Sequence, residues 1–543
     1  MQFVDCRRLT GPNSLWDRPS VVLDVACSPD EARAFQPQWE AAVLRMYAAL
    51  GWDAPVFHAA PFTAGISVAF DAPIDRLYAG IAVAEWAWAE CTGEAVDFDE
   101  TVSAVATRAD DDANPALLAL HAAAVAHRVP FLWDDDLVSV GHGASALTWL
   151  PRELPAPEAV DWASRGRIRV ALVTGTNGKT TTSRLIAHIL RTAGYATGLT
   201  STEGAFIDAQ VLDTGDYAGP GGARMVLRDP GAQAAVLETA RGGLLRRGLG
   251  VETADVALIT NIAEDHLGDF GSQTMQELLD IKWVVTRAVR DAGLLVLNAD
   301  DPALVQQARD YPGRIAWFSL DPDKPVHCQL RGDALYLGDE RLCAAAEIPL
   351  SLGGLATHNI ANALAAAAVC DGLKISIAHI REGLLTMAPD ANIGRGNLYS
   401  TGGCQVLVDF AHNPHAMRAI VATARALPAP RRLLAFSQPG DRPDALIREL
   451  AREAWALDPD CVVVSELEVY ARGRAPGEVV GIIRDELMRC GARDEQVVHT
   501  QTEIEALEHA LAWAQPGDLV VMLALAEGAA VRARLTSQIG GAQ

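Results

Sequence analysis

One short stretch near residue 170 constrains the fold of this chain more than any other. An apolar run, 168–173, is followed directly by Thr-Gly-Thr-Asn-Gly-Lys-Thr-Thr-Thr at 174–182. Apolar residues at helical spacing then occupy 185–190. A strand, a glycine-rich turn, Lys-Thr and a helix form the arrangement that a phosphate-binding loop needs. The stretch therefore predicts a nucleotide site within a parallel α/β sheet.

The residue types of this turn match the chemistry of triphosphate binding. Gly175 and Gly178 let backbone N–H groups approach phosphate oxygens, and the helix N-terminus adds positive potential. Lys179 would neutralise the β- and γ-phosphates, and the Thr180 hydroxyl would ligate Mg²⁺. The common G-x-x-x-x-G-K pattern would place glycine where this chain has Val173, so the loop is a shorter variant. The predicted nucleotide contacts are Gly175, Thr176, Asn177, Gly178, Lys179, Thr180 and Thr181.

Alternating apolar runs and helical stretches continue on both sides of residue 390. The expected strands of a first, mainly parallel sheet are 168–173, 234–237, 256–259, 294–297 and 315–318, with hairpins at 326–350. A second α/β series has expected strands at 406–408, 433–436, 462–464 and 519–523. Such alternation indicates parallel sheets with helices on their faces.

The predicted fold class is α/β with three domains, a number that suits 543 residues. An α+β N-terminal domain would span 1–150, with a strand at 20–25 and helices at about 37–49, 75–91 and 105–128. A central domain with the phosphate loop would span 160–392. A Rossmann-like, doubly wound C-terminal domain would span 393–543.

Two side chains follow predicted strands of the central sheet. Glu238 ends the strand at 234–237, and His266 lies just beyond the strand at 256–259. Parallel sheets place their sites at the carboxyl ends of the strands. A carboxylate and an imidazole there could hold Mg²⁺, which prefers carboxylate. Taken singly, Glu238 also fits a capping or surface role, and His266 also fits a structural histidine.

Lys282 lies on the apolar stripe of an expected helix that starts near 273 and carries Val285 and Val289 at helical spacing. It follows Met275 by seven residues and Leu279 by three, so its ammonium should snorkel to water, pair or be modified. Burial lowers the pKa of a lysine, and a neutral amine could take up CO₂ as a carbamate, an anionic metal ligand. The residues alone leave these alternatives open.

The composition of the chain excludes several classes of binding partner and of structural cross-link. The net charge of −24 argues against binding to nucleic acid or to an anionic membrane, since both need a basic face. Nine scattered cysteines without a C-x-x-C pair favour reduced thiols over a zinc cage or disulfides. We see no signal peptide and no uncharged apolar run of about 18 residues, so we predict a cytoplasmic protein.

Several motifs recur in the order found in one enzyme family. They are 174–182, Leu237–Gly243, Thr260–Leu267, Leu297–Pro302, His358–Ala363, Gly394–Gly396, Val408–Pro414 and Gly440–Arg442. With them the chain resembles the Mur-ligase superfamily over about 167–525, and within it the cyanophycin synthetases. The resemblance implies ATP and Mg²⁺ as cofactors and a ligase that joins a carboxylate to an amine.

The resemblance also implies roles for single residues. Lys179 would act on the phosphates, and Thr180, Glu238, His266 and Lys282 would hold metal, with Lys282 as the carbamate. Asn359 and Asn362 would lie near the adenine, and Arg395 and Asp409 would reach the nucleotide when the domains close about a hinge near 390–395. Substrate contacts would come from Arg241, His412 and Asn413. The residues alone leave Arg241 open as a solvated loop arginine.

The N-terminal region carries the same resemblance. Arg8–Trp16 looks like the start of a cyanophycin synthetase, and 139–143 looks like the segment that opens its ATP-grasp portion. Only about 30 residues separate Gly143 from the phosphate loop, so that portion is missing here. In the relative, ATP-grasp adds aspartate to the backbone and the Mur-like part adds arginine to the side chain. This chain would catalyse only the second kind of reaction.

Three functional hypotheses follow. The first is ATP-dependent ligation through an acyl phosphate, with an amino acid or peptide carboxylate and an amine as substrates. The second is a peptide- or polymer-binding protein with a vestigial nucleotide site. The third is a nucleotide-dependent switch without ligation. The sequence leaves the oligomeric state open, a homo-oligomer included.

Overall fold

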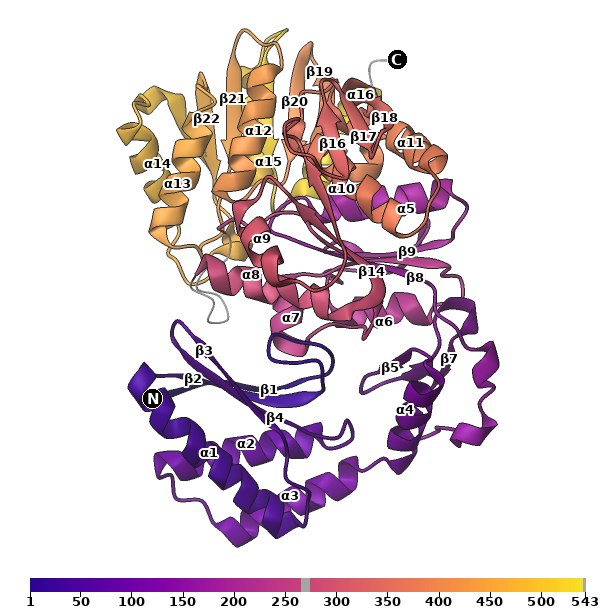
Figure 1. Ribbon diagram of the computed structural model, residues 1–543. Coiled ribbons are helices and arrows are strands. Elements are labelled where there is room, and N and C mark those ends of the chain that lie inside the picture. The colour runs from indigo at the N-terminus through magenta and orange to yellow at the C-terminus, as the bar shows by residue number, and fades with distance from the viewer. Residues whose placement is uncertain (265–273, 541–543) are drawn as a thin grey trace.

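The computed structural model describes residues 1–264 and 274–540 (Figure 1). These residues form four β-sheets, and the two larger ones are mainly parallel with helices on their faces. The predicted α/β fold class is therefore confirmed, and the N-terminal region combines helices with a small antiparallel sheet. The prediction for His266 lies outside the described residues.

The N-terminal sheet is antiparallel, with strand order β1-β2-β4-β3. Its strands are β1 (Gln2–Leu9), β2 (Ser20–Ala26), β3 (Phe57–Phe62) and β4 (Gly65–Asp71). The helices α1 (Pro29–Leu50), α2 (Leu77–Thr92) and α3 (Phe98–Asp112) lie below it in Figure 1. Trp39, Phe35 and Phe70 form part of the core between these layers.

Two helix predictions in this region were wrong in extent. The helix expected at about 37–49 begins at Pro29, because Ser28 and Glu31 form a capping box there. The single helix expected at 105–128 is two helices, α3 and α4 (Pro115–His127). The break has a local cause, since the Asn114 side chain caps α4 and Pro115 favours a first helical position.

A three-stranded sheet links this region to the centre of the molecule. Its strands are β5 (Phe131–Trp133), β6 (Val138–Val140) and β7 (Leu147–Trp149). The chain then enters the 11-stranded central sheet through β8 (Arg169–Thr174). The strand order there is β11-β10-β9-β12-β8-β13-β14-β15-β16-β17-β18. Strand β8 is thus an interior strand, paired in parallel with both of its neighbours.

The predicted strands of the central sheet are all present. The sheet comprises β8, β9 (Thr197–Ser201), β10 (Gly204–Ile207), β11 (Gln210–Thr214), β12 (Ala234–Glu238), β13 (Ala254–Ile259), β14 (Val289–Asn298), β15 (Ile315–Ser319), β16 (Cys328–Arg331), β17 (Ala334–Leu337) and β18 (Glu340–Ala344). Helices α5 (Lys179–Thr192), α10 (Thr357–Gly372) and α11 (Ile377–Thr386) pack on one face around Ile186 and Leu364. Helices α6 (Pro220–Arg228), α7 (Arg241–Arg247), α8 (Met275–Trp283) and α9 (Pro302–Gln307) cover the other (Figure 1).

The helix that carries Lys282 is shorter than expected. Helix α8 ends at Trp283, a 3₁₀ turn spans Val284–Ala288, and Val289 begins β14. Apolar spacing alone could not detect this ending, because buried strand residues continue the apolar pattern.

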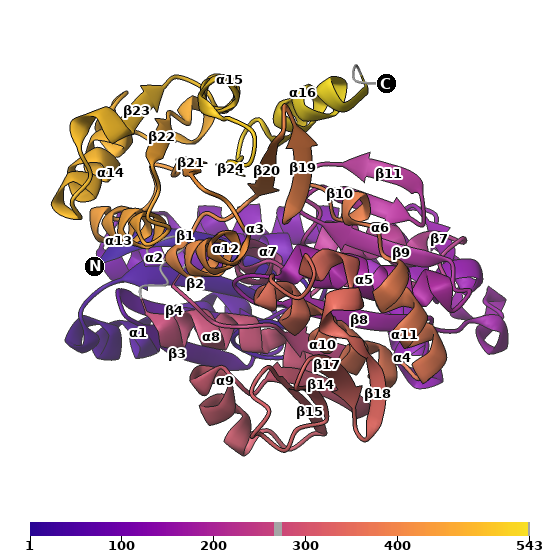
Figure 2. The same cartoon turned by 90° about the horizontal axis from the view of Figure 1, so that it is seen from above.

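The C-terminal sheet has six strands in the order β19-β20-β24-β21-β22-β23. They are β19 (Asn397–Thr401), β20 (Cys404–Asp409), β21 (Arg432–Phe436), β22 (Cys461–Ser465), β23 (Val497–Thr500) and β24 (Leu519–Leu523). Helices α12 (Pro414–Ala426), α13 (Asp444–Trp455) and α14 (Glu478–Arg489) pack on one face, and α15 (Glu503–Trp513) and α16 (Gly528–Gly540) on the other. Figure 2 shows this unit from above, and its α12 contacts α10.

None of the helices in the described part of the chain is long and apolar enough to cross a membrane.

Candidate functional site

The glycine-rich turn connects the end of β8 to the start of α5. Its backbone is held by the neighbouring strand connection: Thr176 N–H donates to Asn261 O at 2.8 Å, and Asn177 N–H to Asn261 Oδ1 at 3.0 Å. The Thr260 hydroxyl donates to Asn177 O at 2.6 Å. The first-turn N–H groups of α5 have no intrahelical acceptor and remain available to an anion.

The two glycines of the turn adopt conformations that other residues avoid, with φ of 142° at Gly175 and 83° at Gly178. A Cβ at Gly175 would lie 1.9 Å from the Thr260 hydroxyl oxygen, and one at Gly178 would lie 2.4 Å from Asn362 Oδ1. The turn is thus packed tightly against both neighbouring segments, as a preformed phosphate cradle requires.

The tight packing at Gly178 predicts a measurable loss of stability when alanine replaces this glycine. Gly194 has a similar φ of 87° but has no atom within 4 Å of an added Cβ. We expect Gly194→Ala to lower the free energy of unfolding by about 1 kcal/mol through backbone strain alone. Gly178→Ala should lower it by about 1–2 kcal/mol more through overpacking. Urea denaturation of both variants measures the difference, and equal losses would show that the turn does not pack against α10 in this way.

Lys179, Thr180 and Glu238 meet at the end of β12. The Thr180 hydroxyl donates to Glu238 Oε1 at 3.2 Å, while Glu238 Oε2 is buried without a hydrogen-bond partner among the described residues. Burial raises the pKa of Glu238, and the charge of Lys179 opposes that shift. Lys179 Nζ donates to Gly175 O at 3.0 Å and Thr176 O at 2.9 Å, so it folds over its own turn.

Glu238 should destabilise the nucleotide-free protein at neutral pH. Below the ordinary pKa of 4.5 the Glu238 carboxyl is protonated in both the folded and the unfolded state, so its ionisation does not lower the free energy of unfolding. Above that pH the unfolded chain loses the proton more readily, so folding becomes less favourable. We expect Glu238→Gln to be more stable than wild type by about 1–2 kcal/mol near neutral pH. Denaturation from about pH 5 to about pH 8 should show the gap widening with pH; a pH-independent gap would contradict a buried ionised carboxylate.

Lys282 projects from α8 toward the same turn. The residue is only 4% exposed, and Nζ donates to Gly175 O at 2.8 Å. Snorkelling to water, one of the alternatives from the sequence, is therefore wrong. The Lys282 and Lys179 amines therefore donate to the same carbonyl oxygen of the glycine-rich turn.

The C-terminal unit reaches the turn through Asn413 and His415. The side-chain amides of Asn413 and Asn177 exchange two hydrogen bonds, at 2.9 and 3.2 Å, and Asn177 Nδ2 also lies 2.9 Å from His415 Nδ1. Asn413 caps α12 through Ala416 N–H at 2.9 Å. Residues more than 230 positions apart thus meet at the phosphate loop. His415 was not among the predicted site residues.

Arg395 and Asp409, both from the C-terminal unit, lie close enough to interact electrostatically. The Arg395 guanidinium lies 4.1 Å from the centre of the Phe410 ring, and desolvation lowers its pKa while Asp409 opposes the shift. His412 Nδ1 lies 2.9 Å from Phe410 O. The Arg395 charge also affects the pKa of Glu238, which places the C-terminal cation within electrostatic range of the buried carboxylate.

Asn359 and Asn362 form a short chain on α10. Asn362 Nδ2 donates to Asn359 Oδ1 at 3.1 Å, and Asn359 Nδ2 donates to Leu350 O at 2.9 Å. The Thr182 hydroxyl of α5 donates to Asn362 Oδ1 at 3.2 Å. The structure places Asn362 directly beside the phosphate loop.

Several positioning residues escaped the sequence interpretation. The Asn392 amide donates to Thr181 Oγ1 at 3.3 Å and to Arg395 O at 3.1 Å. Arg184 of α5 donates to Ile393 O at 3.1 Å and pairs with Glu203. These contacts fix the connection to the C-terminal unit against α5. Both residues lie just outside the motifs at 174–182 and 394–396, where a polar side chain gives no sequence signal for such a role.

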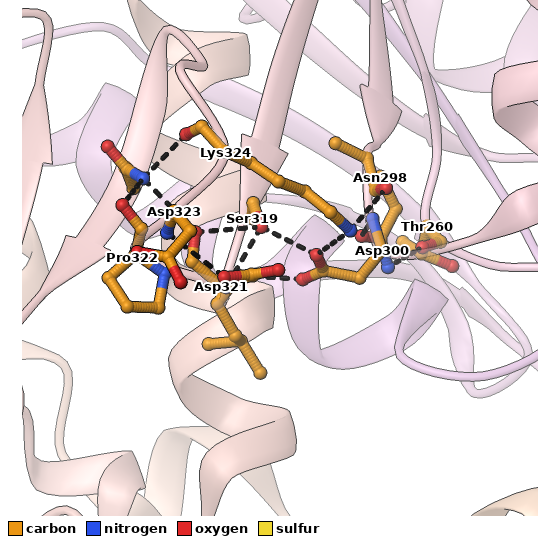
Figure 3. Close-up of polar contacts among 11 residues, drawn as sticks. Thr260, Asn298, Asp300, Ser319, Asp321, Pro322, Asp323 and Lys324 are labelled. Atoms are coloured by element: carbon orange, nitrogen blue, oxygen red, sulfur yellow. Dashed lines mark hydrogen bonds and ion pairs between the residues drawn. The ribbon is translucent and has the colours of Figure 1, made fainter.

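A polar network supports the strand ends beside the turn (Figure 3). Asn298 Nδ2 donates to Thr260 O at 3.1 Å, and Lys324 Nζ donates to Asp300 Oδ1 at 2.8 Å. Ser319 also donates to Asp300. The loops after β13, β14 and β15 are therefore tied together, which holds Thr260 in place under the glycine-rich turn.

Arg241 begins α7, just after Glu238, and is 9% exposed. It is therefore buried rather than a solvated loop residue. Among the described residues, the structure brings Lys179, Thr180, Glu238, Lys282, Asn177 and Asn413 together around one turn. Within the described ranges, no three His, Cys, Asp or Glu side chains gather in a way that could hold a metal ion.

Comparison with known proteins identifies the family to which the chain belongs. The family model for the Mur ligase middle domain matches residues 173–370, and that for the Mur ligase glutamate ligase domain matches 394–524. A UDP-N-acetylmuramyl-tripeptide synthetase from Deinococcus radiodurans is 31% identical over 371 residues, which are 65% of this chain and 72% of that protein. The chain belongs to the Mur ligase family, whose members are ATP-dependent enzymes that form C–N bonds.

Greater similarity is found to cyanophycin synthetases. The protein from Crocosphaera subtropica is 38% identical over 378 residues, which cover 66% of this chain and 42% of that protein. The chain thus spans less than half the length of these relatives. Among solved structures, E. coli FolC in complex with DHPP and ADP has a TM-score of 0.53 at 20% identity, over 68% of this chain and 89% of that one. That likeness supports the fold.

Proposed function

We propose that this protein is an ATP-dependent ligase that activates a carboxylate as an acyl phosphate and joins it to an amine. One observation carries the proposal: a buried carboxylate oxygen of Glu238 without a protein partner lies beside the Thr180 hydroxyl at the phosphate loop. An ionised carboxylate buried in this way needs a cation.

The residues present fit ATP with Mg²⁺. The turn offers backbone N–H groups, Lys179 offers a cation, and Thr180 and Glu238 offer the oxygen ligands that Mg²⁺ prefers. Bound Mg²⁺ would neutralise phosphate charge. Lys282, as a carbamate, and His266 would add two further ligands. Asn359, Asn362, Arg395 and Asp409 would contact the nucleotide.

Phosphoryl transfer depends mainly on the positioning of the reactants and on neutralisation of the phosphate charge. A carboxylate oxygen attacks the γ-phosphorus of ATP, the bond to the β,γ-bridging oxygen breaks, and ADP leaves. The amine nitrogen then attacks the acyl carbon, the C–O bond to the phosphate breaks, and the amine loses a proton. Lys179 would hold the phosphate oxygens during the transfer. Arg241, His412 and Asn413 would orient the substrates.

We further propose a division into units at 1–150, 160–392 and 393–543, with a hinge near 390–395. Gly394 and Gly396 have φ of 70° and 68°, a conformation that glycine adopts without steric cost, and glycine also permits the backbone rotation that a hinge needs. The contacts of Asn413 and His415 with Asn177 support a closed arrangement in which both units contribute to the site. The likeness to cyanophycin synthetases favours an amino acid as amine and a peptide or amino acid carboxylate as acceptor.

ADP release against a panel of carboxylates, each with and without amino acids, tests the proposal. We expect release to require Mg²⁺, a carboxylate and an amine together, with one new amide bond per ADP. Slow ATP hydrolysis that no amine affects would favour a nucleotide-dependent switch. Peptide binding without any ADP release would favour a binding protein with a vestigial site.

A further inference from the structure

A pocket lies at the amino ends of β8, β12 and β13, opposite the end of β8 that leads into the glycine-rich turn. Residues 142–145, 163–169 and 232–233, with Asp255, line an open pocket of about 510 Å³. Strand β8 starts here at Arg169 and ends at the phosphate loop after Thr174. A strand of six residues spans about 20 Å, so this pocket is separate from the nucleotide site.

Three arginines line this pocket from one short segment. Arg165, Arg167 and Arg169 each line the pocket, and the Arg169 guanidinium also lies 4.6 Å from the centre of the Tyr195 ring. Arg165 Nη1 donates to Ser145 O at 2.6 Å, and Arg169 Nε to Leu373 O at 3.1 Å. These acceptors are neutral carbonyl groups. They hold the guanidinium groups in position without cancelling their charge.

The pocket has little negative charge of its own. Asp255, the carboxylate in its lining, already pairs with Arg290. The charge of Arg165 helps to lower the pKa of Asp161, but the two side chains form no ion pair in the described structure. None of the three arginines forms an ion pair with a carboxylate in the part of the chain described. In a protein with a net charge of −24, three cations in the lining of one pocket form a local site that attracts anions.

His142 adds a polar group at the inner wall. It is 4% exposed, and its Nδ1 has no hydrogen-bond partner among the residues described. Burial, reinforced by the charge of Arg167, lowers the pKa of His142 to about 3. The ring is therefore neutral near pH 7 and can give or accept one hydrogen bond. The lining also includes apolar surface from Ala144, Ile168 and Ala232.

We propose that this pocket binds a small multivalent anion whose charges are carboxylate or phosphate groups. Planar guanidinium groups bind both kinds of oxygen pair through paired hydrogen bonds. The volume of about 510 Å³ lies within the range of small-molecule sites. Arg167 is the exposed member of the three arginines, so its guanidinium group is the one most accessible to a bound anion.

Isothermal titration with citrate and with pyrophosphate, at low salt and without Mg²⁺, tests this proposal. Wild type is compared with Arg167→Gln, with Lys179→Ala to remove the phosphate loop's contribution, and with Arg309→Gln as an exposed arginine outside the pocket. We expect binding to survive in the Lys179 and Arg309 variants and to weaken about tenfold or more in Arg167→Gln. An unchanged thermal melt without ligand confirms that Arg167→Gln is folded.

Citrate and pyrophosphate together show whether the natural ligand carries carboxylate or phosphate groups. Binding of citrate alone identifies a carboxylate ligand, binding of pyrophosphate alone identifies a phosphate ligand, and binding of both supports a general anion site. The proposal is overturned if neither probe binds to wild type, or if Arg167→Gln binds both as tightly as wild type does. The result does not depend on ligase activity, so it stands apart from the test of the proposed function.

Discussion

Replacing Lys179 with alanine should reduce ligation about 10³-fold or more while leaving the protein folded. Lys179 Nζ contacts two carbonyl groups of its own turn, and no other described side chain depends on it for a hydrogen bond. Its loss removes the cation that would face the transferred phosphate but disturbs little packing. ADP formation in the presence of the preferred carboxylate and amine measures the effect.

Lys374→Ala provides a matched control. The chain has only four lysines, at 179, 282, 324 and 374, and Lys374 is exposed. It already adopts a φ of 66°, so alanine adds no backbone strain of a new kind. The control should retain wild-type activity. A Lys179→Ala enzyme with near-normal turnover would mean that the loop does not hold the reacting phosphate.

Lys282 should also be required for ligation, but as an anion rather than as a cation. If it acts as a carbamate, both Lys282→Ala and Lys282→Arg lose activity by about 10²–10³-fold, because arginine keeps the positive charge but cannot form the anion. A short carboxylate such as acetate should partly restore the alanine variant by replacing the missing anion, and should do nothing for the arginine variant. Initial rates over a series of acetate concentrations measure the rescue.

Labelling gives a second test of the carbamate. In ¹³C-bicarbonate, wild type should show a carbamate carbonyl resonance that Lys282→Arg lacks, and with four lysines the assignment is direct. Full activity of Lys282→Arg would instead indicate a structural ammonium that holds the Gly175 carbonyl, the contact present at 2.8 Å.

The fold was largely predictable because its signals are local. Apolar runs such as 234–237 and 519–523 are long and unambiguous, and each became an interior strand. The predictions missed β1, which has exposed residues at its start, and the edge strand β3, whose sequence mixes His58 and Pro61 into the pattern. Edge strands bury fewer residues, so they carry weaker alternation.

The site was predictable only in part. The turn at 174–180 and Glu238 stand out because a motif or a strand end marks each of them. The pairing of Asn177 with Asn413, and the contact with His415, depend on the packing of two sheets that are distant in sequence. Asn392 and Arg184 act through backbone and side-chain contacts that leave no pattern. Such long-range contacts require the three-dimensional arrangement.

Transfer of ¹⁸O from the substrate to phosphate tests the central claim most directly. With a carboxylate labelled at both oxygens, the attack on the γ-phosphorus must carry one label into the phosphate that the amine later displaces. Mass spectrometry of the released phosphate should therefore find one ¹⁸O for each amide bond formed. Unlabelled phosphate from a reaction that still forms the amide would contradict activation through an acyl phosphate.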